Sequence, residues 1–235
     1  RGIASSVNSA VVGFVRNFTV AINPQITKSY SSGEHDRMMK LILQGARLSF
    51  YIILIIALPV LVNTHYLLLL WLDQVPEYTV IFVRLVLIFS MSESLSSTLV
   101  TAQLATGKIR DYQLIVGGLA LLNLPASYVL LKMGASSEIV YVVAIIVSVM
   151  CEVARIIMLR KMIGFPVGRF LKDVYFNVII VTLIAVIIPF VIKHYTSETV
   201  FTFLFSCVIS VICTVTSILF VGCNKEERIF VYSKA

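Results

Sequence analysis

Arg16 places a guanidinium group in the middle of the mostly apolar segment 4–26. If this segment is a helix, with about 100° between residues, a stripe of polar side chains shares the face of Arg16. The stripe consists of Ser5, Ser9, Thr19 and Asn23. An arginine fork matches two oxygens of a phosphate at once. We therefore expect the segment to line a water-filled cavity in which Arg16 receives an anion. Alternatively, Arg16 pairs with a carboxylate or with carbonyl groups and only holds the helices together.

Glu93 is a carboxylate inside a second apolar segment, 78–104, and small hydroxyl residues surround it. On a helix, Ser90, Ser97 and Thr101 lie within about 80° of Glu93. A carboxylate in this position is suited to carrying a proton, or to neutralising an arginine. Small hydroxyl residues are also typical of closely packed helices. Glu93 and Ser97 are therefore candidates for ion coupling or for the cavity wall, and a packing role stays open.

The other polar residues inside apolar segments have simpler interpretations. Arg84 lies near the beginning of its segment, where a long side chain can extend to the membrane surface. Glu152 and Arg155 are close to one helical turn apart, which predicts a local ion pair. A further hydroxyl stripe predicts a packing face near the end of the chain, at Ser206, Ser210, Thr214 and Ser217.

Motifs of enzymes and of metal sites do not occur in the sequence. There is no phosphate-binding glycine loop, no HExxH and no nucleophile elbow. The four cysteines have no CxxC spacing, and the three histidines lie at or near predicted loops. We expect a protein that is not an enzyme and that has no cofactor and no metal site.

The composition indicates which elements position these residues. Hydrophobic residues make up 59% of the 235 residues and charged residues only 13%, whereas soluble domains carry about 25% charged residues. A helix needs about 20 mostly apolar residues to span a membrane. Seven segments meet this length, which predicts an all-α integral membrane protein. They are 4–26, 48–70, 78–104, 112–132, 138–159, 175–194 and 199–221.

The charges predict how the chain is oriented. Most of the 19 Lys and Arg residues lie in alternate connections, at 28–47, 108–110, 155–172 and 225–234. The positive-inside rule makes these connections cytoplasmic, with the N-terminus of the chain outside and the C-terminus inside. Stretches 34–47 and 165–173 mix basic and apolar residues as interfacial helices do. Anionic lipid thus accounts for the net charge of +7, and no basic and aromatic patch indicates nucleic acid.

Several local strings are also distinctive. They are INPQITKSY at 22–30 with SGE at 32–34, LWL at 70–72 with VPEYT at 75–79, ATGKIRDYQ at 105–113, and LPASY at 124–128. These strings resemble bacterial polysaccharide exporters of the Wzx type, which share a superfamily with the MATE multidrug exporters and the murein flippase MurJ. The resemblance extends over most of the chain and is strongest between residues 1 and 130.

The resemblance implies a transporter with two helical bundles that face each other across a central cavity. Residues 1–235 would form the C-terminal bundle, in the bacterial inner membrane, and an N-terminal half of the same protein would complete the cavity. The implied function is translocation of polyprenyl-pyrophosphate-linked oligosaccharide repeat units for surface polysaccharides such as O-antigen. In this family, cationic cavity residues are thought to hold the pyrophosphate, and Arg16 has the position to do so.

Partners implied by the resemblance are the lipid-linked oligosaccharide, membrane lipid and other polysaccharide-assembly proteins. Two alternatives remain open. A MATE-like drug or cation exporter would use the same fold, but we expect its cavity to be acidic and aromatic. A seven-helix membrane receptor would also have an outside N-terminus, although it leaves the resemblance unexplained.

Overall fold

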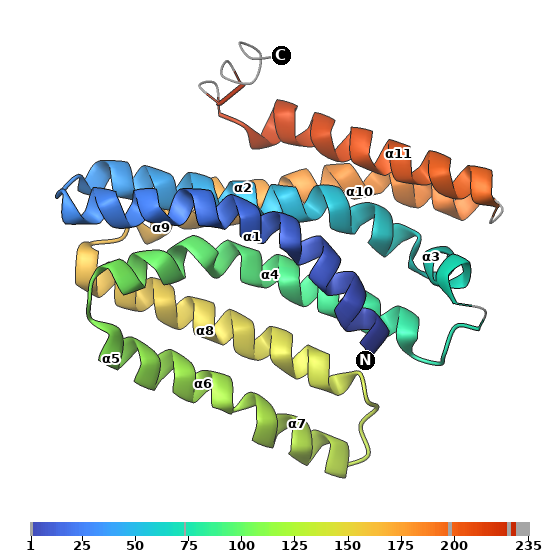
Figure 1. The fold of residues 1–235 in the computed structure, drawn as a ribbon, viewed down its shortest axis with the longest axis horizontal. Helices are drawn as coiled ribbons and strands as arrows, with labels where there is room; N and C mark the ends of the chain where they lie inside the picture. Colours follow the sequence, from blue (N-terminus) through green and yellow to red (C-terminus); the bar gives the residue numbers. More distant parts are fainter. Residues whose placement is uncertain (1, 73, 197–198, 225–226, 229–235) are drawn as a thin grey trace.

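The computed structural model describes residues 2–72, 74–196, 199–224 and 227–228, and the described part of the chain is a bundle of helices (Figure 1). The two chain ends, to which the charge pattern assigns opposite sides of the membrane, lie outside the described residues. The longer helices and their bounds are α1 (Gly2–Ser31), α2 (His35–Val62), α4 (Thr79–Ala105), α8 (Ile139–Ile163), α10 (Asn177–Tyr195) and α11 (Val200–Ser217).

Shorter pieces complete these helices. The short helix α3 (Thr64–Trp71) follows α2. The pieces α5 (Ile109–Tyr112), η1 (Gln113–Gly117), α6 (Gly118–Leu121) and α7 (Asn123–Lys132) follow one another as one run. The pieces α9 (Val167–Phe170) and η2 (Leu171–Phe176) lead into α10, and η3 (Ile218–Gly222) extends α11.

The predicted spans coincide with these helical runs, except that 48–70 covers the second half of α2, the break at Asn63 and most of α3. Among the described residues, six runs are long and apolar enough to cross a membrane. They are His35–Val62, Thr79–Ala105, Ile109–Lys132, Ile139–Ile163, Val167–Tyr195 and Val200–Gly222. The 30-residue helix α1 is long enough, but it is not among the six. The all-α membrane fold is therefore confirmed, whereas a seventh crossing by α1 stays a prediction.

The connections between the runs lie at two opposite ends of the bundle. Figure 1 shows the α1–α2, α4–α5 and α8–α9 connections at one end, and the α3–α4, α7–α8 and α10–α11 connections at the other. The basic residues Lys28, Lys108 and Arg160 belong to the first end. The helices thus bring the predicted basic connections together at one end.

Two local predictions need correction. Stretches 34–47 and 165–173 do not form separate interfacial helices, because they continue without a break into α2 and α10. Pro59 inside the predicted span 48–70 also predicts a kink, whereas the structure has a complete break four residues later. At Asn63 the backbone N–H and the side-chain amide both donate to the Pro59 carbonyl, each at 3.1 Å, and α3 starts anew. Pro59 has no N–H to bond to the Ile55 carbonyl, and the Asn63 side chain adds a second bond to the Pro59 carbonyl at the end of α2.

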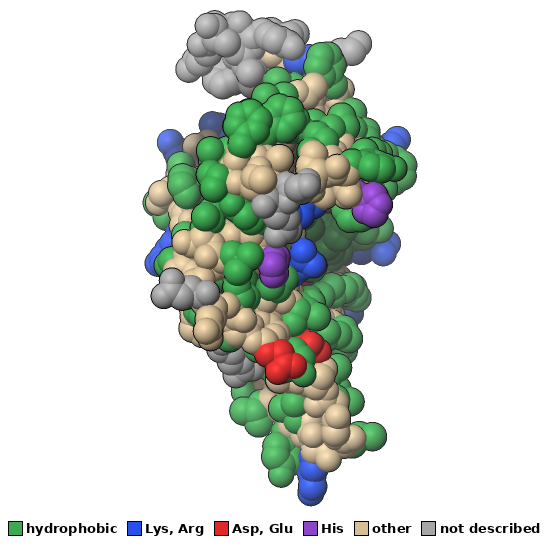
Figure 2. Space-filling model, turned by 90° about the vertical axis from the view of Figure 1, so that its right-hand side faces the viewer, with side chains coloured by type: hydrophobic (Ala, Val, Ile, Leu, Met, Phe, Trp, Pro, Cys, Tyr) green, Lys and Arg blue, Asp and Glu red, His purple; other side chains and the backbone are tan. Residues whose placement is uncertain are grey.

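Helix α11 buries small polar side chains and exposes large apolar ones, as expected for a helix in lipid. Its buried residues are the four small hydroxyl residues Ser206, Ser210, Thr214 and Ser217, which confirms the predicted packing face. Large apolar side chains on its other faces are exposed, for example Phe201 at 78%. The hydroxyl groups of Ser210 and Thr214 donate hydrogen bonds to the backbone carbonyls of Ser206 and Ser210, one turn earlier, each at 2.7 Å. Figure 2, which looks onto the end with the α3–α4 connection, shows hydrophobic side chains along the outer edges of the bundle.

Candidate functional site

A cavity of about 260 Å³ lies between α1, α2 and α4. Helix α1 packs against both α2 and α4, and this packing places the middle of α1 opposite the serine-rich part of α4. The polar wall of the cavity combines the two charged residues predicted from sequence, Arg16 and Glu93, with Thr19 and three serines of α4. Val12 and Val15 of α1 and Ile53 of α2 form the apolar wall. The cavity has room for several waters, since one needs only about 10–15 Å³.

The hydroxyl groups in the cavity wall already have hydrogen-bond acceptors in the protein. Ser94 donates to the Met91 carbonyl at 2.7 Å, and Ser97 donates to the Ser94 carbonyl at 2.9 Å. On α1, Thr19 donates to the carbonyl of Arg16 at 2.9 Å. These hydroxyl groups therefore have no free proton to donate, and their oxygens remain available only as hydrogen-bond acceptors.

The two charged residues of the cavity differ in how they are held. Ser148 of α8, which is buried, donates a hydrogen bond to the Glu93 carboxylate. The Arg16 side chain is exposed, and within the described part of the chain it forms neither an ion pair nor a side-chain hydrogen bond. Glu93 is thus tied to α8, whereas all five donors of Arg16 remain for a ligand or water.

The cavity contains four of the six predicted site residues. Arg16, Thr19, Glu93 and Ser97 line it together, although they come from two helices. Ser9 and Asn23 lie outside this cavity, at positions on α1 toward its two ends. Ser9 is exposed, and the side-chain oxygen of Asn23 is buried without a hydrogen-bond partner in the described part of the chain. Only the middle members of the predicted stripe therefore lie in the cavity.

Asn8 and Ser90 extend the polar contact between α1 and α4, and the sequence analysis missed their pairing. Ser90 of α4 donates to the side-chain oxygen of Asn8 at 2.7 Å. Ser90 also lines the cavity. The sequence signal was the polar residue at position 8 in an apolar segment, but only the packing of α1 on α4 identifies its partner.

The predicted ion pair between Glu152 and Arg155 is wrong for the described residues. Arg155 instead donates from Nη1 to the Ser96 hydroxyl at 3.1 Å, and Tyr175 offers its hydroxyl group to Glu152. Both charged side chains are buried, and Glu152 is 2% exposed. Ser96 of α4 contacts both Arg155 and Glu152, so its hydroxyl group links the two side chains in place of a direct ion pair. These residues join α4, α8 and η2 with buried polar contacts.

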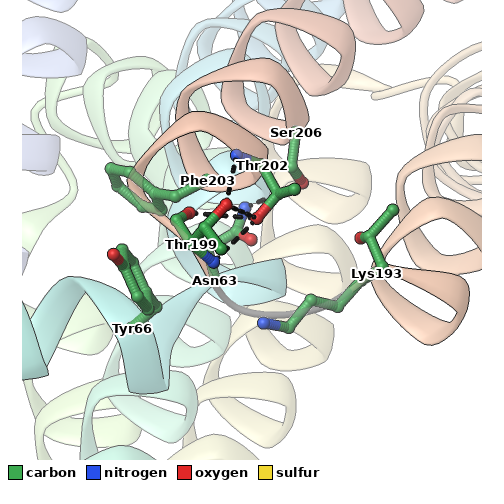
Figure 3. Close-up of a pocket in the computed structure, with 8 residues that line it drawn as sticks. Asn63, Tyr66, Lys193, Thr199, Thr202, Phe203 and Ser206 are labelled. Carbon is green, nitrogen blue, oxygen red and sulfur yellow. Dashed lines mark hydrogen bonds between the residues drawn. The ribbon is translucent and has the colours of Figure 1, made fainter.

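A second, smaller cavity lies at the opposite end from the basic connections (Figure 3). Asn63, Tyr66, Lys193 and Phe203 line it, with the hydroxyl groups of Thr199 and Thr202 and of Ser206. Asn63 donates to the Ser206 hydroxyl at 3.1 Å, which joins the break after α2 to α11. The volume of about 10 Å³ admits no more than one water, so this cavity is a packing feature rather than a ligand site.

The fold and the cavity define the class of the protein: an all-α membrane-embedded bundle with an open, charged cavity between its helices. Comparison with protein-family models, with curated proteins and with solved structures finds no match for this chain. Among the residues that the structure describes, no group of three His, Cys, Asp or Glu side chains could hold a metal ion.

Proposed function

We propose that the chain is one bundle of a membrane exporter that moves polyprenyl-pyrophosphate-linked oligosaccharide units across the bacterial inner membrane for surface polysaccharide assembly. The observation that carries the proposal is the free guanidinium of Arg16 in a cavity of the bundle. The sequence strings that resemble polysaccharide exporters give the class of substrate.

Arg16 needs a functional explanation because a charge at membrane depth costs at least about 2.5–3.5 kcal/mol on insertion scales. An arginine that only held the bundle together would have an acceptor in the protein. Arg16 has none among the described residues, so its donors remain for an anion. A diphosphate fits this role, since charge-assisted bonds from a guanidinium fork are strong and bidentate.

The exposed polar face of α1 supports a second wall for the cavity. Ser5, Ser9 and Arg16 are exposed on this helix, although α1 is packed on α2 and α4. A polar face in a membrane protein belongs to water or to other protein rather than to lipid. We propose that a second bundle of the same protein faces α1 and that the substrate passes between the two bundles. Rocking of the two bundles would then expose the cavity to each side of the membrane in turn.

Deleting the complete gene tests the function. Surface glycan should disappear, and lipid-linked repeat units should accumulate on the cytoplasmic side of the inner membrane. A plasmid copy of the gene should restore both. Intact surface glycan after the deletion, in a strain without a redundant exporter, would refute the proposal.

The carboxylate of Glu93 favours one other candidate, a MATE-like exporter of cations or cationic drugs. Glu93 lines the same cavity as Arg16, and a carboxylate binds cations. In that case Glu93→Gln would abolish transport and Arg16→Ala would spare it. For a diphosphate substrate we expect Arg16→Ala to impair transport more than Glu93→Gln does. Glu93→Gln would then affect only the coupling of transport to an ion. Transport by the two variants therefore separates the candidates.

A further inference from the structure

A second charged pocket, lined by other residues than the Arg16 cavity, lies where α2, α9 and the end of the described chain meet. Its volume is about 220 Å³. Lys40 and Arg47 of α2 and Arg169 of α9 supply three positive charges, and Asp173 of η2 supplies one negative charge. These groups come from the end of the bundle that carries the basic connections.

Arg47 is the buried centre of this pocket, with 3% of its surface exposed. Its Nη2 donates to both carboxylate oxygens of Glu227, at 2.5 and 2.6 Å. The Nε of the same guanidinium is buried and has no hydrogen-bond partner among the residues that the structure describes. A buried arginine with an unused donor indicates a site whose ligands are incomplete.

The carboxylate that reaches Arg47 comes from a segment anchored to α2 and α10. Tyr51 donates to the side-chain oxygen of Asn177 at 2.7 Å, and the amide of Asn177 donates to the Gly222 carbonyl at 3.4 Å. A β-carbon at Gly222 would lie 2.8 Å from the Tyr51 hydroxyl, so the backbone passes close to that ring. Glu227 lies five residues beyond the anchor at Gly222, and its carboxylate also accepts a hydrogen bond from the Asn224 backbone N–H at 2.8 Å.

We propose that this pocket is a binding site for a phosphate group, and that Glu227 is an internal anion that competes for it. The guanidinium groups of Arg47 and Arg169 and the ammonium of Lys40 provide the donors that phosphate requires. With Glu227 in place the five charged groups leave a surplus of one positive charge. Departure of Glu227 raises that surplus to two and frees Nη2. The site does not depend on the transport function, because its residues are separate from those of the Arg16 cavity.

Exposed residues allow a test that leaves the buried arginine in place. In the complete protein, Lys40→Gln with Arg169→Gln removes two of the three charges. Lys172→Gln with Arg160→Gln makes the same charge change at exposed residues outside the pocket. Glu227→Gln removes the competing carboxylate. Correct folding of each variant is checked by size-exclusion chromatography in detergent.

Two probes distinguish the source of the phosphate. Inorganic pyrophosphate is titrated against the purified protein, and its affinity is measured from thermal stabilisation. Nanodiscs with or without phosphatidylglycerol test a lipid headgroup, with bound lipid counted by native mass spectrometry. We expect at least one probe to bind about a hundredfold more weakly to the pocket variant, since each of its two lost charge-assisted bonds accounts for about a factor of ten or more.

Glu227→Gln should bind that same probe several-fold more tightly than the wild type. A response to pyrophosphate assigns the site to a soluble phosphate compound, and a response to phosphatidylglycerol assigns it to a lipid headgroup. Equal binding by the wild type and the pocket variant with both probes would overturn the proposal. An equal loss in the Lys172 and Arg160 control would also overturn it, since the effect would then be one of general surface charge.

Discussion

Replacing Arg16 by alanine separates a substrate-binding arginine from a structural one. The Arg16 side chain has no acceptor among the described residues, so its removal breaks no contact that holds the bundle. We therefore expect the abundance of the folded protein to be unchanged or higher, because a charge that costs about 2.5–3.5 kcal/mol in a membrane is gone. A structural arginine would give the opposite result, a loss of folded protein.

The loss of export should be large. Two hydrogen bonds from the guanidinium to a diphosphate contribute about 1.5–3 kcal/mol each, and therefore about 3–6 kcal/mol together. Each 1.4 kcal/mol corresponds to a factor of ten, so export at limiting substrate should fall roughly a hundredfold or more in Arg16→Ala. Arg16→Lys keeps the charge but loses the bidentate fork, and its export should lie between those of the wild type and Arg16→Ala.

Export should be measured in a deletion strain as surface glycan per folded molecule, with folded protein counted by fluorescence-detected size-exclusion chromatography. Arg84→Ala is the matched control, since Arg84 is an exposed arginine of α4 outside the cavity that donates from Nε to the Thr64 hydroxyl. This control should retain export per molecule. Equal export per folded molecule in Arg16→Ala and the wild type would refute the reasoning.

Three further predictions concern topology and packing. In a variant without the four native cysteines, an impermeant thiol reagent should label Gln74→Cys in intact cells but not Asp36→Cys, and the reverse pattern would overturn the orientation. Ser210→Leu should destabilise the protein by about 1–3 kcal/mol, because Ser210 is fully buried, whereas Val208→Leu on the exposed face should be neutral in a thermal unfolding assay. Gly45→Ala should also lower thermal stability, since its β-carbon would lie 2.7 Å from a methyl group of α4, and an unchanged midpoint would contradict that close packing.

The long apolar runs made the helices predictable, because a 20-residue apolar segment has few other stable structures. Their ends were less predictable. Stretch 34–47 mixes basic and apolar residues whether it lies on a membrane surface or continues a span, and only its packing on α1 and α4 decides. The break at Asn63 depends on bonds to Pro59 and to Ser206, which is 143 residues away.

The candidate site was predictable only within single helices. The polar stripe marked Arg16 and Thr19, and the serine-rich segment marked Glu93 and Ser97. That these two pairs share a cavity depends on how α1 crosses α4, and no spacing within either helix contains that information. The contact between Arg47 and Glu227 joins residues 180 positions apart, and the sequence analysis gave no sign of it.

The unequal packing of the helices has a consequence for synthesis and insertion. Ile109–Lys132 has only 11% of its most apolar stretch buried, and its main partner, α8, follows it in the chain. This run must therefore reside in lipid alone until α8 emerges, and its high apolarity allows that. Helix α1 is more polar and is less suited to lie in lipid without partners. Its partners α2 and α4 follow it directly in the chain, and α4 ends at residue 105. Synthesis of α2 and then α4 thus supplies the two helices against which α1 packs.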